Sequence, residues 1–230
     1  MNIIPFEVLI FDLDGTLIDS APDVRACMNR VLVDMGRGEL TLKEIKNMVG
    51  WGGRVLVEKA LAKTGSAWTE GEVDRALKDF LDIYAKNPVN HSTLYPGVVS
   101  ALDGFKATGI RMGICTNKPK ATTLPVLEAM GLDHFFDVLS CGDTVPYRKP
   151  DGRHVRLVVD ELGGTIKSSA MIGDSESDIT AAIDAGVRSI AVTFGYAHMP
   201  YENLGADALI NNFNELAQAL VDIAPAKLEA

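Results

Sequence analysis

Two aspartates stand two residues apart at the end of a short apolar run. The run from Val8 to Phe11 is followed at once by Asp12 and Asp14, and then by Gly15. Side chains at positions i and i+2 of an extended segment project to the same side, so the two carboxyl groups would share one small space. This pair suits a carboxylate nucleophile beside a carboxyl acid. The simpler alternative is an acidic surface turn, since Asp and Gly are common turn residues.

Further polar residues stand next to other predicted elements. Thr116 and Asn117 follow one apolar run, Asp174 and Asp178 follow another, and Lys149 precedes a predicted helix. In an open parallel α/β sheet, ligands bind beyond the carboxyl ends of the strands, so we expect these residues to converge on one site. Each has a plainer explanation when taken alone, as a helix cap, an exposed helical face or a surface lysine.

The elements that must position these residues follow from the hydrophobic pattern. Short apolar runs alternate with helical stretches, which predicts a doubly wound α/β fold with a mostly parallel, Rossmann-like sheet. The predicted strands are 8–11, 111–115, 138–140, 170–172, 189–192 and 208–210. The predicted helices are 98–106, 119–130, 155–162 and 179–185, with Gly131 and Gly186 as stop signals for the second and the last.

Residues 21–90 interrupt this alternation. They show helical periodicity and no convincing strand, which predicts an α-helical cap inserted into a discontinuous core of residues 1–20 and 91–230. The chain would leave the core after Ser20 and return near His91. Two adjacent connecting segments of this kind form a natural hinge.

Several carboxylates in one site would repel each other. A pair of unit charges at 4 Å costs about 1 kcal/mol in water and about 4 kcal/mol at an effective dielectric of 20. A divalent cation removes this repulsion, and oxygen ligands from Asp12, the Asp14 carbonyl and Asp174 suit Mg²⁺. The four histidines are scattered and no cysteine pair is present, which disfavours zinc.

Phosphoryl transfer is the reaction that needs this set of groups. Asp12 would attack phosphorus and form an aspartyl-phosphate. Asp14 would protonate the leaving alkoxide and then activate water, for which its carboxyl group must be neutral near pH 7, a bias of roughly 4 kcal/mol. Thr116 and Asn117 would bind phosphate oxygens, and Lys149 would screen the charge between Asp12 and the phosphoryl group.

Composition narrows the class of partner. The 230 residues carry a formal net charge of −9, which argues against nucleic acid and against an anionic membrane surface. No apolar run approaches the length of a transmembrane helix. Three cysteines without a C-x-x-C motif favour a reduced, cytoplasmic setting. An anionic ligand would therefore need a local positive field at its site.

The chain resembles the phosphatase branch of the haloacid dehalogenase superfamily over almost its whole length. Four motifs carry the resemblance: Asp12-Leu13-Asp14-Gly15-Thr16, Thr116-Asn117, Lys149, and Gly173-Asp174 with Asp178. The resemblance implies that Asp12 and Asp174 contact Mg²⁺, that Asp178 supports the metal site, and that residues 21–90 form a helical cap. Relatives that cleave carbon-halogen or carbon-phosphorus bonds lack an acid equivalent to Asp14, so its presence favours phosphoester chemistry.

Within this branch the chain is most similar to the phosphatases of 2-phosphoglycolate. This finer resemblance rests on residues 12–20, Tyr95-Pro96-Gly97, Thr116-Asn117-Lys118-Pro119 and Phe194-Gly195-Tyr196. One departure is Gly152, where relatives commonly have proline, and this leaves the start of the helix after Lys149 open.

The segment 49–54 of the cap has two interpretations. It could be a turn between helices with a packed Trp51, or a substrate loop in which Gly52 and Gly53 permit close approach and Arg54 clamps a carboxylate. We expect Arg54 or this loop to read the glycolate end of the substrate. The segment is not a dinucleotide fingerprint, because Val55 stands where a third glycine should be.

The resulting hypothesis is a Mg²⁺-dependent phosphatase of a small phosphorylated metabolite, with 2-phosphoglycolate first among the substrates. A sugar-phosphate phosphatase, a pyrophosphatase and a phosphosugar mutase remain alternatives within the same superfamily. A noncatalytic sensor of phosphorylated metabolites is a more remote one. The sequence leaves the oligomeric state open, with a homodimer as one arrangement.

Overall fold

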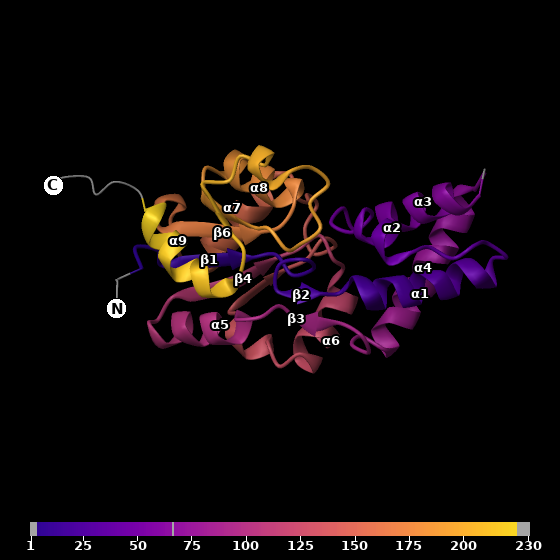
Figure 1. The fold of residues 1–230 in the computed structure, drawn as a ribbon, viewed down its shortest axis with the longest axis horizontal. Helices are drawn as coiled ribbons and strands as arrows, with labels where there is room; N and C mark the ends of the chain where they lie inside the picture. Colours follow the sequence, from indigo (N-terminus) through magenta and orange to yellow (C-terminus); the bar gives the residue numbers. More distant parts are fainter. Residues whose placement is uncertain (1–3, 66, 225–230) are drawn as a thin grey trace.

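The computed structural model describes residues 4–65 and 67–224, and its centre is a six-stranded sheet (Figure 1). All paired neighbours in this sheet are parallel, and the strand order is β5-β4-β1-β6-β7-β8. The strands are β1 (Val8–Phe11), β4 (Arg111–Cys115), β5 (Val138–Ser140), β6 (Ser169–Gly173), β7 (Arg188–Val192) and β8 (Ala208–Ile210). The predicted doubly wound fold is confirmed, with every predicted strand in place.

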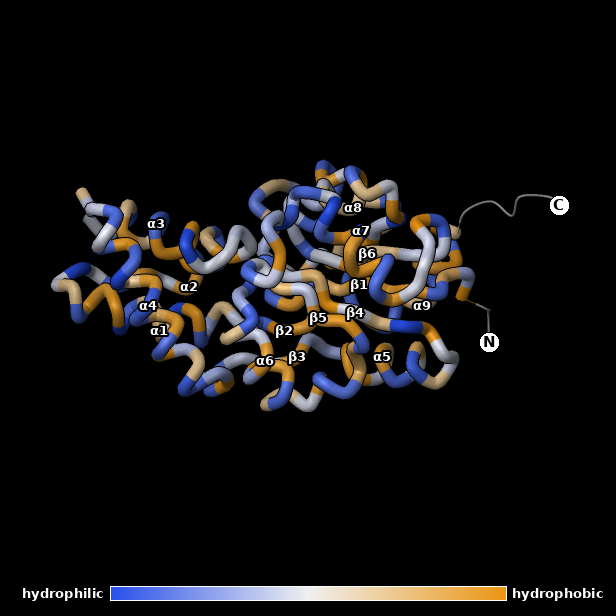
Figure 2. The backbone as a smooth tube through the Cα atoms, turned by 180° about the vertical axis from the view of Figure 1, so that it is seen from behind, coloured by the Kyte–Doolittle hydropathy of each residue, from blue (hydrophilic) through white to orange (hydrophobic). Residues whose placement is uncertain are grey.

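Helices cover both faces of this sheet. They are α5 (Val98–Ala107), α6 (Lys120–Ala129), α7 (Gly152–Glu161), α8 (Glu176–Ala185) and α9 (Leu216–Asp222). Short 3₁₀ turns are Asp133–Phe135, Ile166–Ser168, Tyr201–Asn203 and Phe213–Glu215. On the central strand β1, Val8 and Ile10 pack with residues of α7 and α8, whereas Leu9 and Phe11 join the cluster that includes α5 and α9. Burial on both faces explains why β1 is apolar at every position (Figure 2).

The helical insertion lies at the end of the molecule opposite α9 (Figure 1). It contains α1 (Ala21–Asp34), α2 (Leu42–Lys46), α3 (Gly53–Thr64) and α4 (Glu70–Lys86). Two short antiparallel strands, β2 (Ile18–Asp19) and β3 (Thr93–Leu94), join it to the sheet. The predicted helical insertion is therefore present, and its boundaries at residues 21 and 90 remain our proposal. No helix within residues 4–65 and 67–224 is long and apolar enough to cross a membrane.

One buried carboxylate ties the two connecting segments together. Asp23, in the first turn of α1, is only 1% exposed. It accepts hydrogen bonds from the backbone N–H groups of Asn90, His91 and Ser92 and from the Ser92 hydroxyl, at 2.6–3.0 Å. These bonds hold the pKa of Asp23 below its ordinary value although burial alone would raise it.

Two helices begin earlier than the hydrophobic pattern predicts. The predicted starts were Val155 and Ile179, whereas α7 begins at Gly152 and α8 at Glu176. The first turn of each helix is polar and is stabilised by a capping side chain. In α7 this is Asp151, whose side chain accepts from the Arg153 N–H at 2.9 Å. An apolar pattern does not include such capping residues, which explains the error.

Gly152 is the first residue of α7, so the helix begins at the position where relatives commonly have proline. Its N–H donates to Asp184 Oδ2 at 2.7 Å. A Cβ atom at this position would lie 2.5 Å from the Ala185 backbone nitrogen and 2.6 Å from Asp184 Oδ2. Glycine thus allows the beginning of α7 to pack directly against the end of α8.

We expect Gly152→Ala to lower the free energy of unfolding by about 1–3 kcal/mol, because the added methyl group overpacks this contact. Urea unfolding measures the change. Gly104→Ala is the matched control, since Gly104 lies in α5 and an added Cβ meets nothing within 4 Å. The control should raise stability by up to about 1 kcal/mol through helix propensity. Equal changes in the two variants would contradict the packing argument.

Candidate active site

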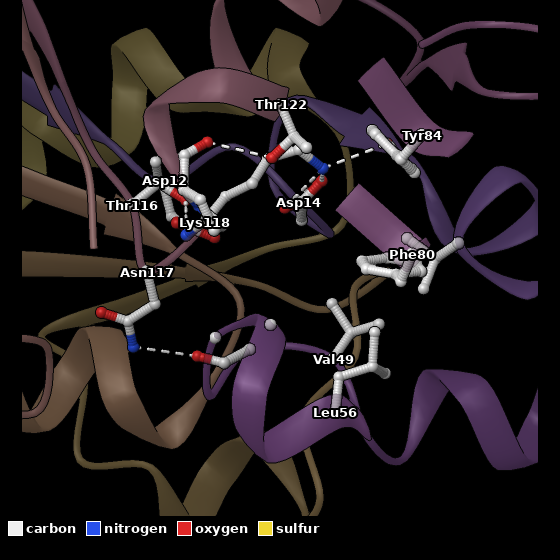
Figure 3. A pocket seen from close by; sticks show the side chains of 15 residues that line it. Asp12, Asp14, Val49, Leu56, Phe80, Tyr84, Thr116, Asn117, Lys118 and Thr122 are labelled. Atoms are coloured by element: carbon white, nitrogen blue, oxygen red, sulfur yellow. Dashed lines mark hydrogen bonds and ion pairs between the residues drawn. The ribbon is translucent and has the colours of Figure 1, made fainter. Parts of the chain in front are cut away.

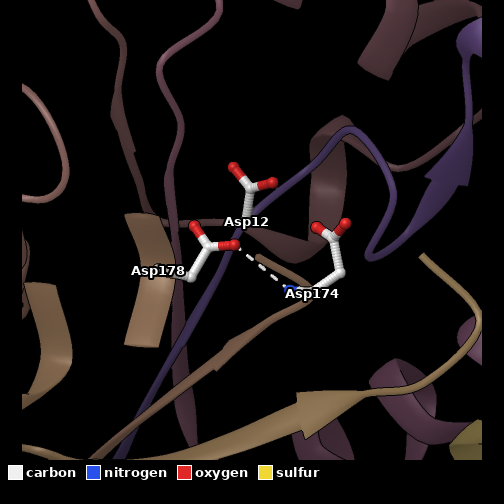
Figure 4. Close-up of side chains that lie close together, drawn as sticks. All are labelled: Asp12, Asp174 and Asp178. Atoms are coloured by element: carbon white, nitrogen blue, oxygen red, sulfur yellow. Dashed lines mark hydrogen bonds between the residues drawn. The ribbon is translucent and has the colours of Figure 1, made fainter. Parts of the chain in front are cut away.

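The carboxyl ends of β1, β4 and β6 meet at one edge of the sheet. They place Asp12, Thr116 and Asp174 there, each buried. Asp178, in the first turn of α8, completes a set of three carboxyl groups (Figure 4). One oxygen from each of Asp12, Asp174 and Asp178 lies within 4.8 Å of the others. Residues far apart in the sequence therefore converge where the strand pattern predicts.

Lys149 supplies a positive charge within this cluster. Its Nζ donates to Asp12 Oδ1 at 2.7 Å and to Asp178 Oδ1 at 2.6 Å. Burial disfavours the charged ammonium, but the two carboxylates outweigh it and raise the pKa of Lys149. The lysine therefore remains charged and holds one oxygen of Asp12 in place, which leaves the other oxygen of Asp12 for a ligand.

Asn117 fixes the segment that carries Lys149. Its amide nitrogen donates to the Lys149 carbonyl at 2.9 Å, and its amide oxygen accepts from the Lys149 N–H at 3.0 Å. The same nitrogen donates to the Gly50 carbonyl of the insertion at 3.0 Å. Both amide hydrogens are thus engaged by backbone oxygens, which gives Asn117 a positioning role. Its contact with phosphate stays a prediction.

Asp178 positions its neighbours through both of its oxygens. Lys149 holds Oδ1, while Oδ2 accepts from the backbone N–H groups of Asp174 and Ser175 at 3.1 and 3.0 Å. The Ser175 hydroxyl donates to the same Oδ2 at 2.7 Å. These contacts fit the supporting role that the sequence resemblance implies for Asp178.

Asp174 lies in a tightly built cradle. It accepts from the Thr16 hydroxyl at 3.0 Å and from the Tyr196 N–H at 2.6 Å. A Cβ atom on Gly15 would lie 2.4 Å from its Oδ2, and one on Gly195 would lie 2.2 Å from its Cβ. Glycine at position 15 thus permits both the turn, which has a φ of +93°, and the close approach of the Asp174 side chain.

The electrostatics of the cluster favour a bound cation. Burial is the main reason that the pKa of Asp12 rises to about 7, against the opposing effect of Lys149. Burial, Asp178 and Asp12 also hold the pKa of Asp174 well above its ordinary value. When all three acids are ionised, they carry more negative charge than Lys149 can offset, and the atoms they offer to a metal are all oxygen. The residues fit Mg²⁺, with Asp12 and Asp174 as the candidate ligands and Asp178 in support.

We expect Mg²⁺ to stabilise the protein more near pH 8 than near pH 5. The pKa of Asp12 is about 7 in the folded metal-free protein and about 3.8 as an ordinary carboxyl group. Between these values the folded state binds the extra proton, so this contribution to stability is complete below pH 3.8 and is lost as the pH rises through 7. Bound Mg²⁺ favours the ionised form and offsets the loss.

Thermal unfolding with and without Mg²⁺ at the two pH values measures this coupling. The Asp12→Asn variant is the comparison: it lacks this titrating metal ligand, so Mg²⁺ should raise its Tm less than that of the wild type at pH 8. An equal rise in Tm on adding Mg²⁺ at both pH values in the wild type would contradict the assignment.

Asp14 lies beside the acidic cluster with partners of its own. Its carboxylate accepts from the Ser20 hydroxyl at 2.5 Å and from Lys118 Nζ at 3.0 Å. Lys118 Nζ also donates to the Tyr84 hydroxyl of α4 at 3.0 Å. Lys118 was part of the sequence resemblance but was assigned no role. Its position directly after Thr116 and Asn117, just past the end of β4, was the signal that could have identified it.

A pocket lies between this edge of the sheet and the helical insertion (Figure 3). Asp12, Asp14, Thr116, Asn117 and Lys118 line its polar end. The insertion contributes a mostly apolar wall, formed by Val24, Val49, Gly50, Gly52, Gly53, Leu56, Phe80 and Tyr84. The cavity between these two walls is about 50 Å³ and opens to solvent. This volume suits a small ligand.

Arg54 lies away from this pocket. Its guanidinium forms ion pairs with Glu58, Glu70 and Asp74 at 3.1, 2.5 and 2.6 Å, all within the insertion. It is absent from the residues that line the pocket, whereas Gly52 and Gly53 are present. A role for Arg54 in clamping a substrate carboxylate stays a prediction, and it requires the side chain to leave three carboxylate partners.

A family model described as haloacid dehalogenase-like hydrolase matches residues 9–192, which include every carboxylate and lysine of this site. The chain belongs to this family.

Several proteins and solved structures within this family are similar to the chain over most of its length. A phosphoglycolate phosphatase from Agrobacterium fabrum is 38% identical over 213 residues, which cover 93% of this chain and 91% of that protein. One from Caulobacter vibrioides is 36% identical over 94% of this chain and 91% of that protein. The crystal structure of a predicted phosphoglycolate phosphatase from Haemophilus somnus matches with a TM-score of 0.90 at 30% identity, covering 94% of this chain and 99% of that one. CbbY from Rhodobacter sphaeroides, crystallised with phosphate, matches with a TM-score of 0.78 at 26% identity, covering 94% and 99%.

Proposed function

We propose that this phosphatase hydrolyses 2-phosphoglycolate to glycolate and phosphate through a phosphoenzyme formed on Asp12. The chain is a phosphoric monoester hydrolase of the haloacid dehalogenase-like family, and its relatives at 36–39% identity are named phosphoglycolate phosphatases. The observation that carries the proposal is the convergence of Asp12, Asp14, Lys149 and Asp174 at one edge of the sheet.

Asp12 and its neighbours perform the first displacement. Lys149 holds Asp12 Oδ1, so the second carboxylate oxygen attacks phosphorus and the ester oxygen leaves. The Thr116 hydroxyl, at the end of β4, binds an oxygen of the phosphoryl group. Mg²⁺, when bound by Asp12 and Asp174, would neutralise charge on the phosphoryl oxygens.

Asp14 handles the protons of both steps. In its neutral form it protonates the leaving alkoxide, and as a carboxylate it then removes a proton from the water that hydrolyses the phosphoenzyme. The contact with Lys118 shows Asp14 beside a cation, so the acid step requires the ester oxygen to approach the side of Asp14 that the ammonium does not cover.

The pocket supports a small substrate. The cavity of about 50 Å³ is lined by Leu56, Phe80 and Tyr84 of the insertion beside the polar groups of the core, which favours a small substrate with a short apolar part. One observation favours a sugar phosphate as the second candidate, since CbbY was crystallised with xylulose bisphosphate and is 25% identical to this chain. The pyrophosphatase, mutase and sensor alternatives have no comparable support.

A screen of phosphate release tests the proposal. We expect Mg²⁺-dependent turnover with the highest kcat/KM for 2-phosphoglycolate in a panel of glycolytic and pentose phosphates, inorganic pyrophosphate and small phosphomonoesters. Asp12→Asn is the control for contaminating phosphatase. A higher kcat/KM for a sugar phosphate or pyrophosphate would contradict the substrate, and transfer of phosphate between sugars without release would identify a mutase. A cytoplasmic location and a homodimer stay predictions.

A further inference from the structure

Lys118 is a buried cation at the junction of the sheet and the insertion. It follows β4 directly after Thr116 and Asn117, and its side chain is only 7% exposed. Its Nζ lies 3.0 Å from Asp14 Oδ1 and 3.0 Å from the Tyr84 hydroxyl, and 4.3 Å from the centre of the Tyr84 ring. Burial works against the charge, but Asp14 and Tyr84 outweigh it and raise the pKa of Lys118. The group is an ammonium ion at neutral pH.

Other cations near the site lie outside the pocket lining, whereas Lys118, which is paired with Asp14, lies within it. Arg54 is paired with three carboxylates of the insertion, Lys46 with Asp19, and Lys149 with Asp12 and Asp178. Among the described residues that line the pocket, Lys118 provides the single positive charge (Figure 3). A ligand with a second negative group would meet this ammonium first.

The ammonium also has the capacity for another acceptor. A lysine offers three N–H donors, and here it serves two partner residues, with the second oxygen of Asp14 at the longer distance of 3.3 Å. A carboxylate of the ligand can accept the Lys118 N–H that now makes the longer hydrogen bond to the second oxygen of Asp14.

The position of Asp14 places a substrate carboxylate near Lys118. If Asp14 protonates the ester oxygen, that oxygen lies within hydrogen-bond distance of Asp14, and Lys118 Nζ touches the same carboxyl group. In 2-phosphoglycolate one methylene group separates the ester oxygen from the carboxylate. The carboxylate therefore falls close to the ammonium, with Leu56 and Phe80 of the insertion around the methylene group.

We propose that Lys118 binds the carboxylate of the substrate and thereby selects small phosphomonoesters with an anionic group next to the ester. This inference rests on the proposed function and adds the residue that sets the specificity. It assigns to Lys118 the task for which the sequence suggested Arg54.

Kinetics on two matched esters test the proposal. 2-Hydroxyethyl phosphate replaces the carboxylate of 2-phosphoglycolate by a neutral CH₂OH group of similar size. We expect Lys118→Met to lower the ratio of kcat/KM for 2-phosphoglycolate over 2-hydroxyethyl phosphate by about 10- to 100-fold, the value of one charge-assisted hydrogen bond. Lys118→Arg should restore part of the ratio. Lys120→Met, which removes an exposed lysine two residues away, should leave the ratio unchanged.

The outcomes separate this proposal from the proposed function. If the wild type prefers 2-phosphoglycolate and Lys118→Met slows both esters by the same factor, Lys118 acts only through Asp14 and the carboxylate assignment is overturned. If Arg54→Ala, rather than Lys118→Met, collapses the ratio, the specificity belongs to the loop of the insertion and the assignment is overturned as well. A wild type that hydrolyses both esters equally well would overturn the proposed substrate and, with it, the role of Lys118.

Discussion

Asp12→Asn is expected to lower kcat for 2-phosphoglycolate by about 10⁴-fold or more, the size of effect seen when a member of a nucleophilic catalytic group is removed. Asparagine keeps the shape of the side chain but lacks the anionic oxygen that attacks phosphorus. The variant should still fold, because burial already disfavours the ionised form of Asp12 and raises its pKa to about 7, so a neutral side chain is tolerated at this position. Phosphate release measures the loss, and thermal unfolding shows that the fold is retained.

Two controls make this result specific. The intact mass of the variant excludes deamidation of the new asparagine back to aspartate. Asp151→Asn serves as the comparison, since Asp151 caps α7 at the surface, two residues from Lys149, and accepts from Arg153. It should reduce stability slightly and leave kcat within a few-fold of the wild type. An Asp12→Asn variant with activity within tenfold of the wild type would refute the nucleophile.

Asp14→Asn is expected to lower kcat by about 10²- to 10⁴-fold on alkyl esters, because it removes the general acid and the general base together. The amide oxygen can still accept from Ser20 and Lys118, so the local packing is kept. p-Nitrophenyl phosphate distinguishes the two roles, since its leaving group needs no proton. With this ester the variant should release a burst of about one nitrophenolate per active site and then turn over slowly, because formation of the phosphoenzyme survives and its hydrolysis does not.

Rapid-mixing absorbance measures the burst. The wild type, in which water attack is assisted, provides the reference amplitude. A variant that retains full steady-state turnover on 2-phosphoglycolate would contradict both assignments of Asp14.

The core of the fold could be predicted from the sequence because its signals are local. β1 is apolar at every position since it is buried on both faces, and the acids that follow it mark the end of the strand. Helix starts were less predictable. α7 and α8 begin with polar turns whose capping contacts, such as that of Asp151, add nothing to an apolar period.

The site also contains residues that the sequence predicts well and residues that it predicts poorly. Asp12 and Asp174 stand at strand ends, so the topology of a parallel sheet brings them together. Arg54 and Lys118 depend on how the insertion packs on the core. The sequence around Arg54 does not indicate that Glu70 and Asp74, at the start of α4, pair with its side chain. Likewise, the contact of Lys118 with Tyr84 depends on the packing of α4 against α6, the helix that follows β4.

The stereochemical course at phosphorus tests the central claim most directly. A phosphorothioate ester made chiral by oxygen isotopes serves as the substrate, and the configuration of the released thiophosphate is determined. Attack by Asp12 followed by attack of water gives two inversions, so the account predicts net retention of configuration. Net inversion would mean that water attacks the ester directly, and it would contradict the phosphoenzyme on Asp12.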